Sequence, residues 1–206
     1  MSLTAAVMKV RSTSTIQPFA SQVFAVHPSA FRCNQEALAD NVFMDAAIDC
    51  DSAEFDEKVK AQHAEFVSNI RNAGIPVTVY QQPGDAAPDA IFPDWFTCYK
   101  GDAIPGGVLI LHPMKYLSRR NERAPEIVAS LKAKFKHCID LTEFEKRGLA
   151  LEGKGAIVFH HRARCFLIAR SERSCPEVID ALVTEWNKLS KVPYRAVTFE
   201  ARDTSD

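Results

Sequence analysis

Two carboxylates stand in unusual surroundings in this chain, and their surroundings suit binding chemistry. Asp94 lies in FPDWF, between Pro93 and Trp95, with a phenylalanine on either side. Glu152 interrupts the apolar run LALEGKGAIVF and is followed by Gly-x-Gly. A carboxylate framed by aromatic rings suits a planar cation, because the carboxylate meets the edge of the cation and the rings pack its faces. A lone carboxylate that is buried implies a cationic ligand or an internal arginine, since it is costly unless paired.

Each carboxylate also has a plain structural interpretation, and the residues themselves leave both open. Pro93 and Asp94 are common turn formers, so FPDWF is equally compatible with an Asx turn. Glu152 is compatible with a hairpin edge at which its side chain points to solvent. In the functional interpretation, the two glycines after Glu152 let a ligand or another strand approach the backbone closely.

Two arginine-rich segments are candidates for binding an anionic group. Arg173, in SERS, falls just before a predicted helix, near a helix N-terminus that favours anions, and it suits bidentate binding of a carboxylate. For SRRNER we favour a structural interpretation, a helix entry stabilised by i,i+3 pairs such as Arg119–Glu122.

Histidines and cysteines give no local catalytic or metal motif. His160 and His161 are adjacent, but no Cys, Asp or further His lies nearby at ligand spacing, so we predict no metal site. The chain contains no CxxC pair, and no cysteine has a histidine in its local sequence that would lower its pKa. Cys98 lies close to Asp94, whose charge would raise the pKa of a neighbouring thiol.

Composition excludes several classes of protein. The chain has 206 residues, of which 47% are hydrophobic and 25% charged, with a net charge of −1, so nothing favours binding to nucleic acid or to an anionic membrane. No apolar run approaches the roughly 18–20 residues that span a bilayer. The cysteines are sparse, which favours reduced thiols and a cytoplasmic protein. Residues 1–20 are predicted to be a flexible N-terminus, a mitochondrial transit peptide being the alternative, and residues 21–206 one partial domain.

Three amphipathic helices are predicted from apolar spacing near 3.6 residues. The first has the stripe Phe55, Val59, His63, Phe66 and Ile70 and ends at Gly74; the second, with Pro125 in its first turn, has Ile127, Val128, Leu131 and Phe135. The third begins at SCPE, where Ser174 and Glu177 have the spacing of a capping box, and continues through Ile179, Leu182, Val183, Trp186 and Leu189.

Short apolar runs of the strand type flank these helices and give a repeat. The first helix is preceded by the run 22–27 and followed by 76–80. The second is preceded by 89–99 and 106–111 and followed by 137–141. The third is preceded by 155–160 and 164–169 and followed by 194–199. A β-β-α-β unit therefore recurs three times, which predicts an α/β protein of small sheets and outer helices, arranged as modules. Asp94 and Glu152 fall at equivalent points of successive units, so units placed around an axis would bring both carboxylates to it.

The motifs resemble those of the penteins, a superfamily of guanidine-modifying enzymes. PDAIFPDWF, HPMKYLSRRNER, FEKRGLALEGKGAIVF and ARSERS, in this order, are similar to the amidinotransferase-like citrulline hydrolases and, more distantly, to the arginine deiminases. The resemblance implies a five-bladed α/β propeller of ββαβ units, about three of which this chain contains. It also implies Cys/His covalent catalysis on a guanidino or ureido amino acid such as arginine or citrulline, with no metal or organic cofactor.

The resemblance also assigns roles to residues of this chain. Asp94 corresponds to the residue that grips the planar head group, with Phe92 beside it. Glu152 corresponds to the catalytic Glu that holds or orients that group, and Arg173 to the arginine that meets the substrate carboxylate. This sequence departs from the pattern because FPDWF is one residue shorter than the FPNNWF usual in that branch.

A second departure concerns the reacting groups. The family continues into a His-containing strand, further units and a Cys near the C-terminus, whereas this sequence ends at Asp206, before the expected His. We therefore expect the N-terminal portion of a hydrolase, with binding carboxylates but without the reacting pair. The alternative is an inactive paralogue that covers its open edges by forming an oligomer, a homodimer for example, and binds a ligand or partner.

Overall fold

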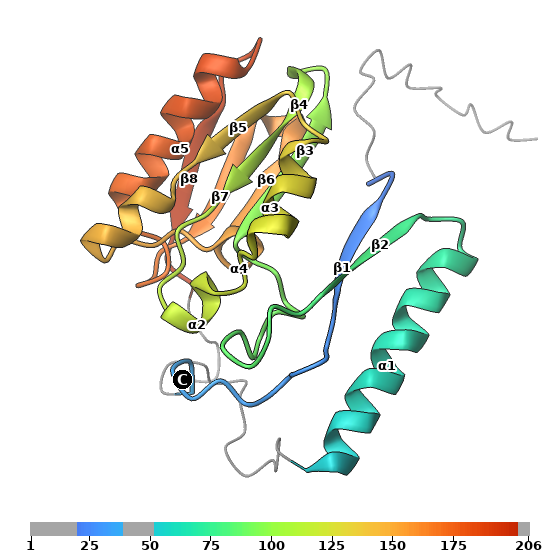
Figure 1. Cartoon of the computed structure of the whole chain (residues 1–206). Helices are drawn as coiled ribbons and strands as arrows, with labels where there is room; N and C mark the ends of the chain where they lie inside the picture. Colours follow the sequence, from blue (N-terminus) through green and yellow to red (C-terminus); the bar gives the residue numbers. More distant parts are fainter. Residues whose placement is uncertain (1–19, 39–51, 202–206) are drawn as a thin grey trace, which may run out of the picture.

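Three small sheets and the helices that cover them make up the computed structural model of this chain (Figure 1). The structure describes residues 20–38 and 52–201. The predicted flexible N-terminus lies outside the described residues except for Ala20, as do Cys50 and the last five residues. Among the described residues, no helix combines the length and the hydropathy needed to cross a membrane.

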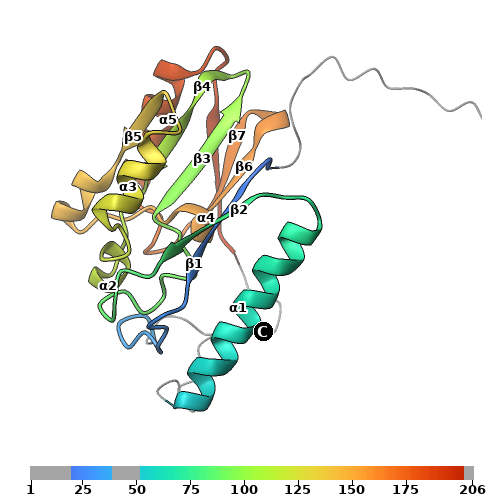
Figure 2. The same ribbon diagram turned by 45° about the vertical axis from the view of Figure 1, so that its right-hand side comes forward.

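The first unit pairs β1 (Val23–His27) with β2 (Val77–Gln81) in parallel and packs α1 (Ala53–Asn72) against them. Figure 2 shows α1 lying beside this sheet, apart from the other helices. Ser52 caps α1 by accepting a hydrogen bond from Phe55 N (3.2 Å), and Gly74 follows its end with a positive φ of 81°, as predicted. The predicted apolar stripe is wrong at one position, because Phe66 is 55% exposed and Val67 is buried instead.

The second unit has the predicted β-β-α-β order. Its sheet runs β3-β4-β5, with β3 (Phe96–Gly101) antiparallel to β4 (Ile104–Leu111) and β4 parallel to β5 (His137–Asp140). The short helix α2 (Leu117–Arg120) and then α3 (Pro125–Lys132) lie between β4 and β5 in the chain, and Pro125 occupies the first turn of α3 as predicted. The predicted strand at 89–99 is too long, because turns hydrogen-bonded from Ala90 N and Phe92 N precede β3.

The third unit repeats this topology with the order β6-β7-β8. A 3-10 helix η1 (Thr142–Arg147) and a single turn, α4 (Gly153–Ala156), lead into β6 (Ile157–His160); η2 (His161–Ala163) connects β6 to β7 (Cys165–Ala169). Helix α5 (Pro176–Leu189) precedes β8 (Arg195–Phe199), which is parallel to β7. The ββαβ unit thus occurs twice, whereas the described part of the first unit has one strand before its helix.

The capping box predicted for α5 is wrong. Its N-cap is Cys175, with no side-chain hydrogen bond, and Ser174 is buried. The Ser174 hydroxyl donates to Ala169 O (2.6 Å) and accepts from Ser171 N (2.8 Å), so it closes the preceding turn instead. Glu177 forms an exposed ion pair with Arg147 (3.0 Å).

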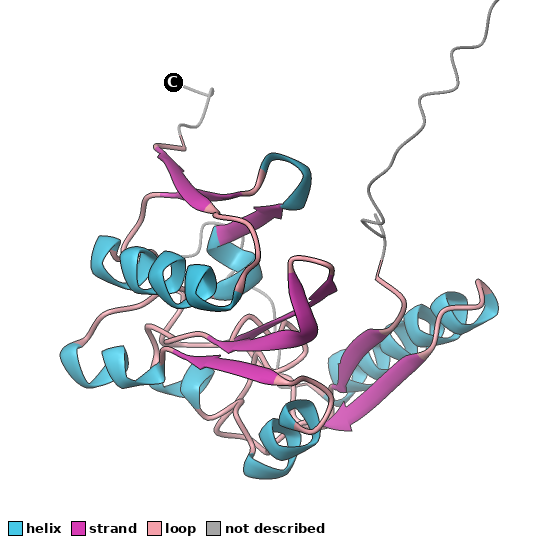
Figure 3. Cartoon of the chain, turned by 90° about the horizontal axis from the view of Figure 1, so that it is seen from above, coloured by secondary structure: helices cyan, strands magenta, loops and turns pink. Residues whose placement is uncertain are grey.

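The main core joins the second and third units. It includes apolar side chains of β4, β5, β7 and α5, among them Ile110, Ile139, Phe166 and Trp186. Helix α5 contacts β8 of its own unit and β5 of the unit before it. Figure 3 shows the small sheets from above, with helices between and outside them. Because buried apolar area is the main stabilising contribution, this shared core fixes the two units that contain Asp94 and Glu152.

Candidate functional site

The loops that contain the two predicted carboxylates lie against each other. Asp94 is two residues before β3, and Glu152 immediately precedes α4. Gly153 N donates a hydrogen bond to Asp94 O (2.9 Å), and a Cβ at Gly155 would lie 3.4 Å from Asp94 Oδ2. The glycines therefore allow the close approach that the sequence suggested, and the approach is between two loops of the same chain.

Glu152 is buried, with only 2% of its surface exposed. Its Oε1 accepts a hydrogen bond from Lys115 N (3.1 Å), and its Oε2 lies 3.4 Å from Arg173 Nη1. Glu152 N in turn donates to Arg173 O (3.0 Å). The alternative of a solvent-facing Glu at a hairpin edge is therefore wrong, because the segment turns inward onto the Arg173 loop.

Asp94 is less enclosed and is held by an arginine from the second motif. Its side chain is 21% exposed, and Oδ2 lies 3.6 Å from Arg119 Nη2. Arg119 Nη2 also donates to Phe92 O (2.6 Å), so the same guanidinium fixes the backbone on which Asp94 sits. Phe92 projects outward, 57% exposed, with its ring centroid 6.2 Å from that of Phe31.

Arg119 is the centre of a buried charge cluster that the sequence prediction only partly describes. The predicted i,i+3 pair is confirmed, with Nε 2.5 Å from Glu122 Oε1, and Nη1 lies 3.8 Å from Asp89 Oδ2. Asp89 also accepts a hydrogen bond from Asn34 Nδ2 (2.7 Å). The contacts with Asp89 and Asp94 cross 25 or more positions in the chain, so no local spacing indicates them.

Glu122 is a carboxyl group whose titration is strongly perturbed by burial. Burial to 1% exposure raises its pKa to about 8; Arg119 opposes the shift, and the negative Asp89 and Asp94 add to it. The short contact with Arg119 favours the ionised form, but the desolvation of the carboxyl group prevails. Glu122 therefore stays largely protonated below neutral pH.

A histidine and a lysine lie next to the two loops. His112 is fully buried, with Nε2 2.9 Å from Thr97 Oγ1, and burial together with the Lys154 charge lowers its pKa to about 3. Lys154 contacts Pro93 O, its Nζ lies 5.2 Å from the Phe96 ring centroid, and burial lowers its pKa. His112 is consequently a neutral, hydrogen-bonded group that packs against Gly153.

Arg173 lies at the open side of Glu152. Its side chain is partly exposed, and the guanidinium lies 5.5 Å from the ring centroid of Tyr116. Tyr116 also has Lys115 Nζ over its ring, at 5.0 Å, and Lys115 Nζ contacts Glu172 Oε2 (2.6 Å). Sequence reasoning missed Tyr116, whose only signal is its position before the arginine motif.

The thiols in the described part of the chain are all free. The five are Cys33, Cys98, Cys138, Cys165 and Cys175. Burial raises the pKa of Cys98 to about 12, although Lys154, Lys100 and Lys134 oppose the shift, and burial also raises the pKa of Cys138. The predicted direction for Cys98 is confirmed, but the cause is desolvation and not the charge of Asp94.

No metal centre is formed within residues 20–38 and 52–201. These residues contain no group of three or more His, Cys, Asp or Glu side chains arranged to hold a metal ion. His160 Nδ1 accepts a hydrogen bond from Ala163 N (3.0 Å), and His161 Nδ1 lies 3.3 Å from the Tyr194 hydroxyl.

Solved structures of guanidine-modifying hydrolases share this fold. A dimethylarginine dimethylaminohydrolase in an adduct with S-methyl-L-thiocitrulline matches with a TM-score of 0.63 and 16% identity over 88% of this chain and 62% of that chain. The Pseudomonas aeruginosa enzyme complexed with citrulline matches with a TM-score of 0.61 and 15% identity, over 89% of this chain and 63% of that chain. The substrate-bound N-terminal domain of ArgZ, an arginine dihydrolase from Cyanobacteria, matches with a TM-score of 0.63 and 16% identity. The match covers 87% of this chain and 58% of that chain.

The chain thus spans about 60% of the length of these structures. No curated protein matches it. The family described as eukaryotic N,N dimethylarginine dimethylhydrolase matches residues 27–206. The predicted relationship to the penteins is confirmed, and the chain belongs to this dimethylarginine dimethylhydrolase family of guanidine-modifying hydrolases.

Proposed function

We propose that residues 21–206 form the first three units of a five-unit α/β propeller and hold the substrate of a hydrolase that acts on a methylated arginine. The observation that carries the proposal is the contact between the Asp94 and Glu152 loops, which come from successive units. Membership of the dimethylarginine dimethylhydrolase family supports it, as does the likeness to about 60% of the length of the solved structures.

In this proposal the carboxylates hold the planar guanidinium. Asp94 and Glu152 accept its N–H groups, and the exposed ring of Phe92 covers a face. The Asp94–Arg119 and Glu152–Arg173 contacts, at 3.6 and 3.4 Å, are longer than good charge-assisted hydrogen bonds, so a guanidinium can compete for the same oxygens. Arg173, released from Glu152 and partly exposed, then meets the α-carboxylate of the substrate.

The reaction requires a nucleophile, and burial makes Cys98 and Cys138 unsuited to that role by raising the pKa of each thiol. Hydrolysis of dimethylarginine replaces the dimethylamino group with oxygen from water and yields citrulline and dimethylamine. In the covalent route a thiolate attacks the guanidinium carbon and a histidine carries the proton to the leaving amine. Because the Cys98 thiol has a pKa of about 12 and His112 one of about 3, we propose that these two are not the reacting pair and that the reacting Cys and His lie outside the described residues.

An assay of citrulline release by the purified 206-residue chain tests this division of roles. We expect the chain to bind N,N-dimethylarginine without turning it over. Asp94→Asn and Glu152→Gln should each weaken this binding. Turnover abolished by Cys98→Ser, with Cys138→Ser as the matched control, would show that the chain contains its own nucleophile and would refute the proposal.

The second candidate function is that of an inactive paralogue which forms an oligomer and binds a ligand or partner. Exposed apolar side chains on both edge strands of the third sheet, Val158 on β6 and Phe199 on β8, favour it. Light scattering separates the two candidates. A discrete dimer that Val158→Thr or Phe199→Thr dissociates supports the paralogue, and a monomer that binds dimethylarginine supports the binding portion of a hydrolase.

A further inference from the structure

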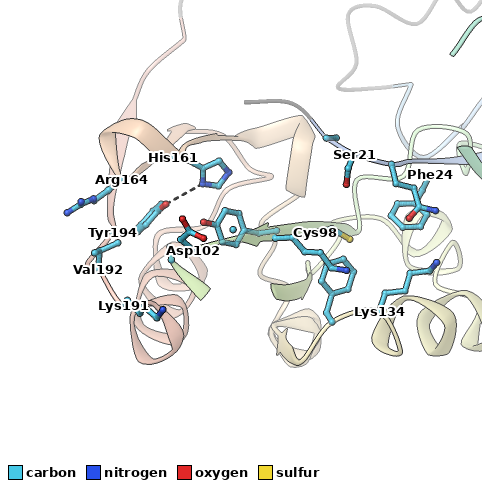
Figure 4. Close-up of a pocket in the computed structure, with 17 residues that line it drawn as sticks. Ser21, Phe24, Cys98, Asp102, Lys134, His161, Arg164, Lys191, Val192 and Tyr194 are labelled. Carbon is cyan, nitrogen blue, oxygen red and sulfur yellow. Dashed lines mark hydrogen bonds between the residues drawn. The ribbon is translucent and has the colours of Figure 1, made fainter. Parts of the chain in front are cut away.

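A cavity of about 950 Å³ lies away from the Asp94–Glu152 loops, at the other end of β3 (Figure 4). Its walls come from the segment before β1, the β3–β4 hairpin, the loop after α3, η2 with the residue that follows it, and the loop between α5 and β8. This volume is at the upper end of the range of small-molecule sites in proteins. All three units contribute to it, so the fold and not a single loop maintains it.

Four cations line this cavity. Lys100, Lys134, Arg164 and Lys191 form no ion pair with any carboxylate in the described ranges, whereas the arginines of the Asp94–Glu152 region do. Among the residues that line the cavity, Asp102 is the only carboxylate. Tyr194 adds no negative charge, because burial raises the pKa of its hydroxyl to about 12. The lining thus has an excess of positive charge in a chain whose net charge is −1.

The cations are divided between the two ends of the cavity. Arg164 and Lys191 lie at the end with Tyr194, and Lys134 lies at the end with Phe24 (Figure 4). Lys134 Nζ is 5.8 Å from the Phe24 ring centroid, and Lys100 Nζ is 5.2 Å from that of Phe135, so aromatic faces hold these ammonium groups at their end.

The middle of the cavity is bounded by packed rings and is not positively charged. The ring centroids of Tyr99 and His161 are 4.6 Å apart, and His161 Nδ1 lies 3.3 Å from the Tyr194 hydroxyl. Burial lowers the pKa of His161, which keeps this ring neutral near pH 7. A ligand in the cavity therefore meets two cations toward each end, neutral rings between them, and the Asp102 carboxylate beside Tyr194 (Figure 4).

We propose that this cavity is a binding site for an elongated small organic anion that has a phosphate or carboxylate group at each end. Arg164 and Lys191 would hold one end, and Lys100 and Lys134 the other. Unpaired cations that line a concave, partly low-dielectric surface attract anions more strongly than isolated surface lysines. This inference is independent of the proposed hydrolase function, because it uses none of the residues of the Asp94–Glu152 region.

Isothermal titration calorimetry with three probes tests the site in the full chain. Fructose 1,6-bisphosphate has an anion at each end, fructose 6-phosphate at only one, and adipate has two carboxylates. We expect the bisphosphate to bind about tenfold or more tightly than the monophosphate, because each end gains a charge-assisted contact. Adipate binding within a few fold of the bisphosphate would identify carboxylates as sufficient, and weaker binding would identify phosphate as the preferred group.

Two double variants, one for each end, separate the site from general charge attraction. Arg164→Asn with Lys191→Gln removes one end, and Asn suits the positive φ of Arg164 (52°). Lys100→Gln with Lys134→Gln removes the other. Each double variant should lower bisphosphate affinity about tenfold and bring the bisphosphate and monophosphate to similar affinities.

The control double variant, Lys58→Gln with Lys132→Gln, removes two exposed lysines that have no ion pair within the described residues and do not line the cavity. It should change affinity less than twofold. Equal binding of bisphosphate and monophosphate to the wild-type chain, or an equal loss in the control and the end variants, would overturn the proposal. The thermal melt of each variant shows that it is folded before it is titrated.

Discussion

The charged side chains at the two ends of β3 differ in whether they form ion pairs. At the Asp94 end, Arg119 holds the carboxylates of the buried cluster, and Arg173 holds Glu152. At the Lys100 end, cations line a cavity and have no ion-pair partner among the described residues. A paired buried charge holds its neighbours in place, because removing one partner leaves the other desolvated and unpaired. An unpaired exposed charge contributes little to stability and remains available to a ligand.

Replacing Arg119 should have the largest effect on stability. Arg119→Leu leaves Asp89 and Asp94 without their shared cation and Glu122 without its partner, and should cost about 3–5 kcal/mol of unfolding free energy. Urea denaturation followed by circular dichroism measures the unfolding free energy. Arg147→Leu is the control, since its pair with Glu177 is exposed and should be worth less than about 1 kcal/mol. Equal losses in the two variants would mean that the buried cluster does not stabilise the fold.

The contact between the Asp94 and Glu152 loops can be broken at a single position. In Gly153→Ala the added Cβ would lie 2.6 Å from Asp94 O and 2.8 Å from His112 Cδ2, neither of which can move freely. We expect a loss of about 1–3 kcal/mol in unfolding free energy, typical of overpacking. In Gly155→Ala, in the same turn, the added Cβ would meet only the Asp94 carboxyl group, at 3.4 and 3.7 Å, so this substitution should be nearly neutral. Thermal unfolding of both variants at one pH compares their stabilities, and equal melting temperatures would contradict the described packing.

Glu122 should make stability depend on pH. Its pKa in the folded chain is raised to about 8 from 4.5, so between these values the folded state binds more protons than the unfolded state. Stability should therefore fall as pH rises through this window, by up to about 1.4 kcal/mol per pH unit. Glu122→Gln should remove this slope, as measured by denaturation from pH 5 to 8. Glu143→Gln, at an exposed pair with Lys146, should leave the slope unchanged; an equal slope in Glu122→Gln would contradict this assignment.

The smallest effect on stability is expected at the cavity. Lys134→Gln with Lys191→Gln removes two cations that form no ion pair within the described residues, and it should change unfolding free energy by no more than about 0.5 kcal/mol. At low salt we expect a slight gain in unfolding free energy. The substitutions remove repulsion between the lining cations, and at low salt that repulsion is not screened in the wild-type chain. Melting temperatures at low and high salt measure this. A loss comparable to that of Gly153→Ala would show that these cations are structural after all.

Sequence reasoning located the candidate carboxylates because their signal is local. The glycines after Glu152 and the aromatic residues around Asp94 are adjacent to them in the chain, and the repeat indicated that the two segments meet. Local reasoning failed at Ser174, where the capping-box spacing was present but the hydroxyl found nearer backbone partners. The long-range contacts of Arg119 and the cavity lined by all three units have no local signal, because they depend on how the units pack.

Binding of N,N-dimethylarginine to the purified chain tests the central claim most directly. The proposal predicts a calorimetric dissociation constant of about 1 mM or tighter, weakened about tenfold in Asp94→Asn and in Glu152→Gln and unchanged in the cavity variants, with all variants folded. Absence of binding to the wild-type chain, or equal affinity in the wild type and both carboxylate variants, would contradict the claim that these two loops form the substrate site.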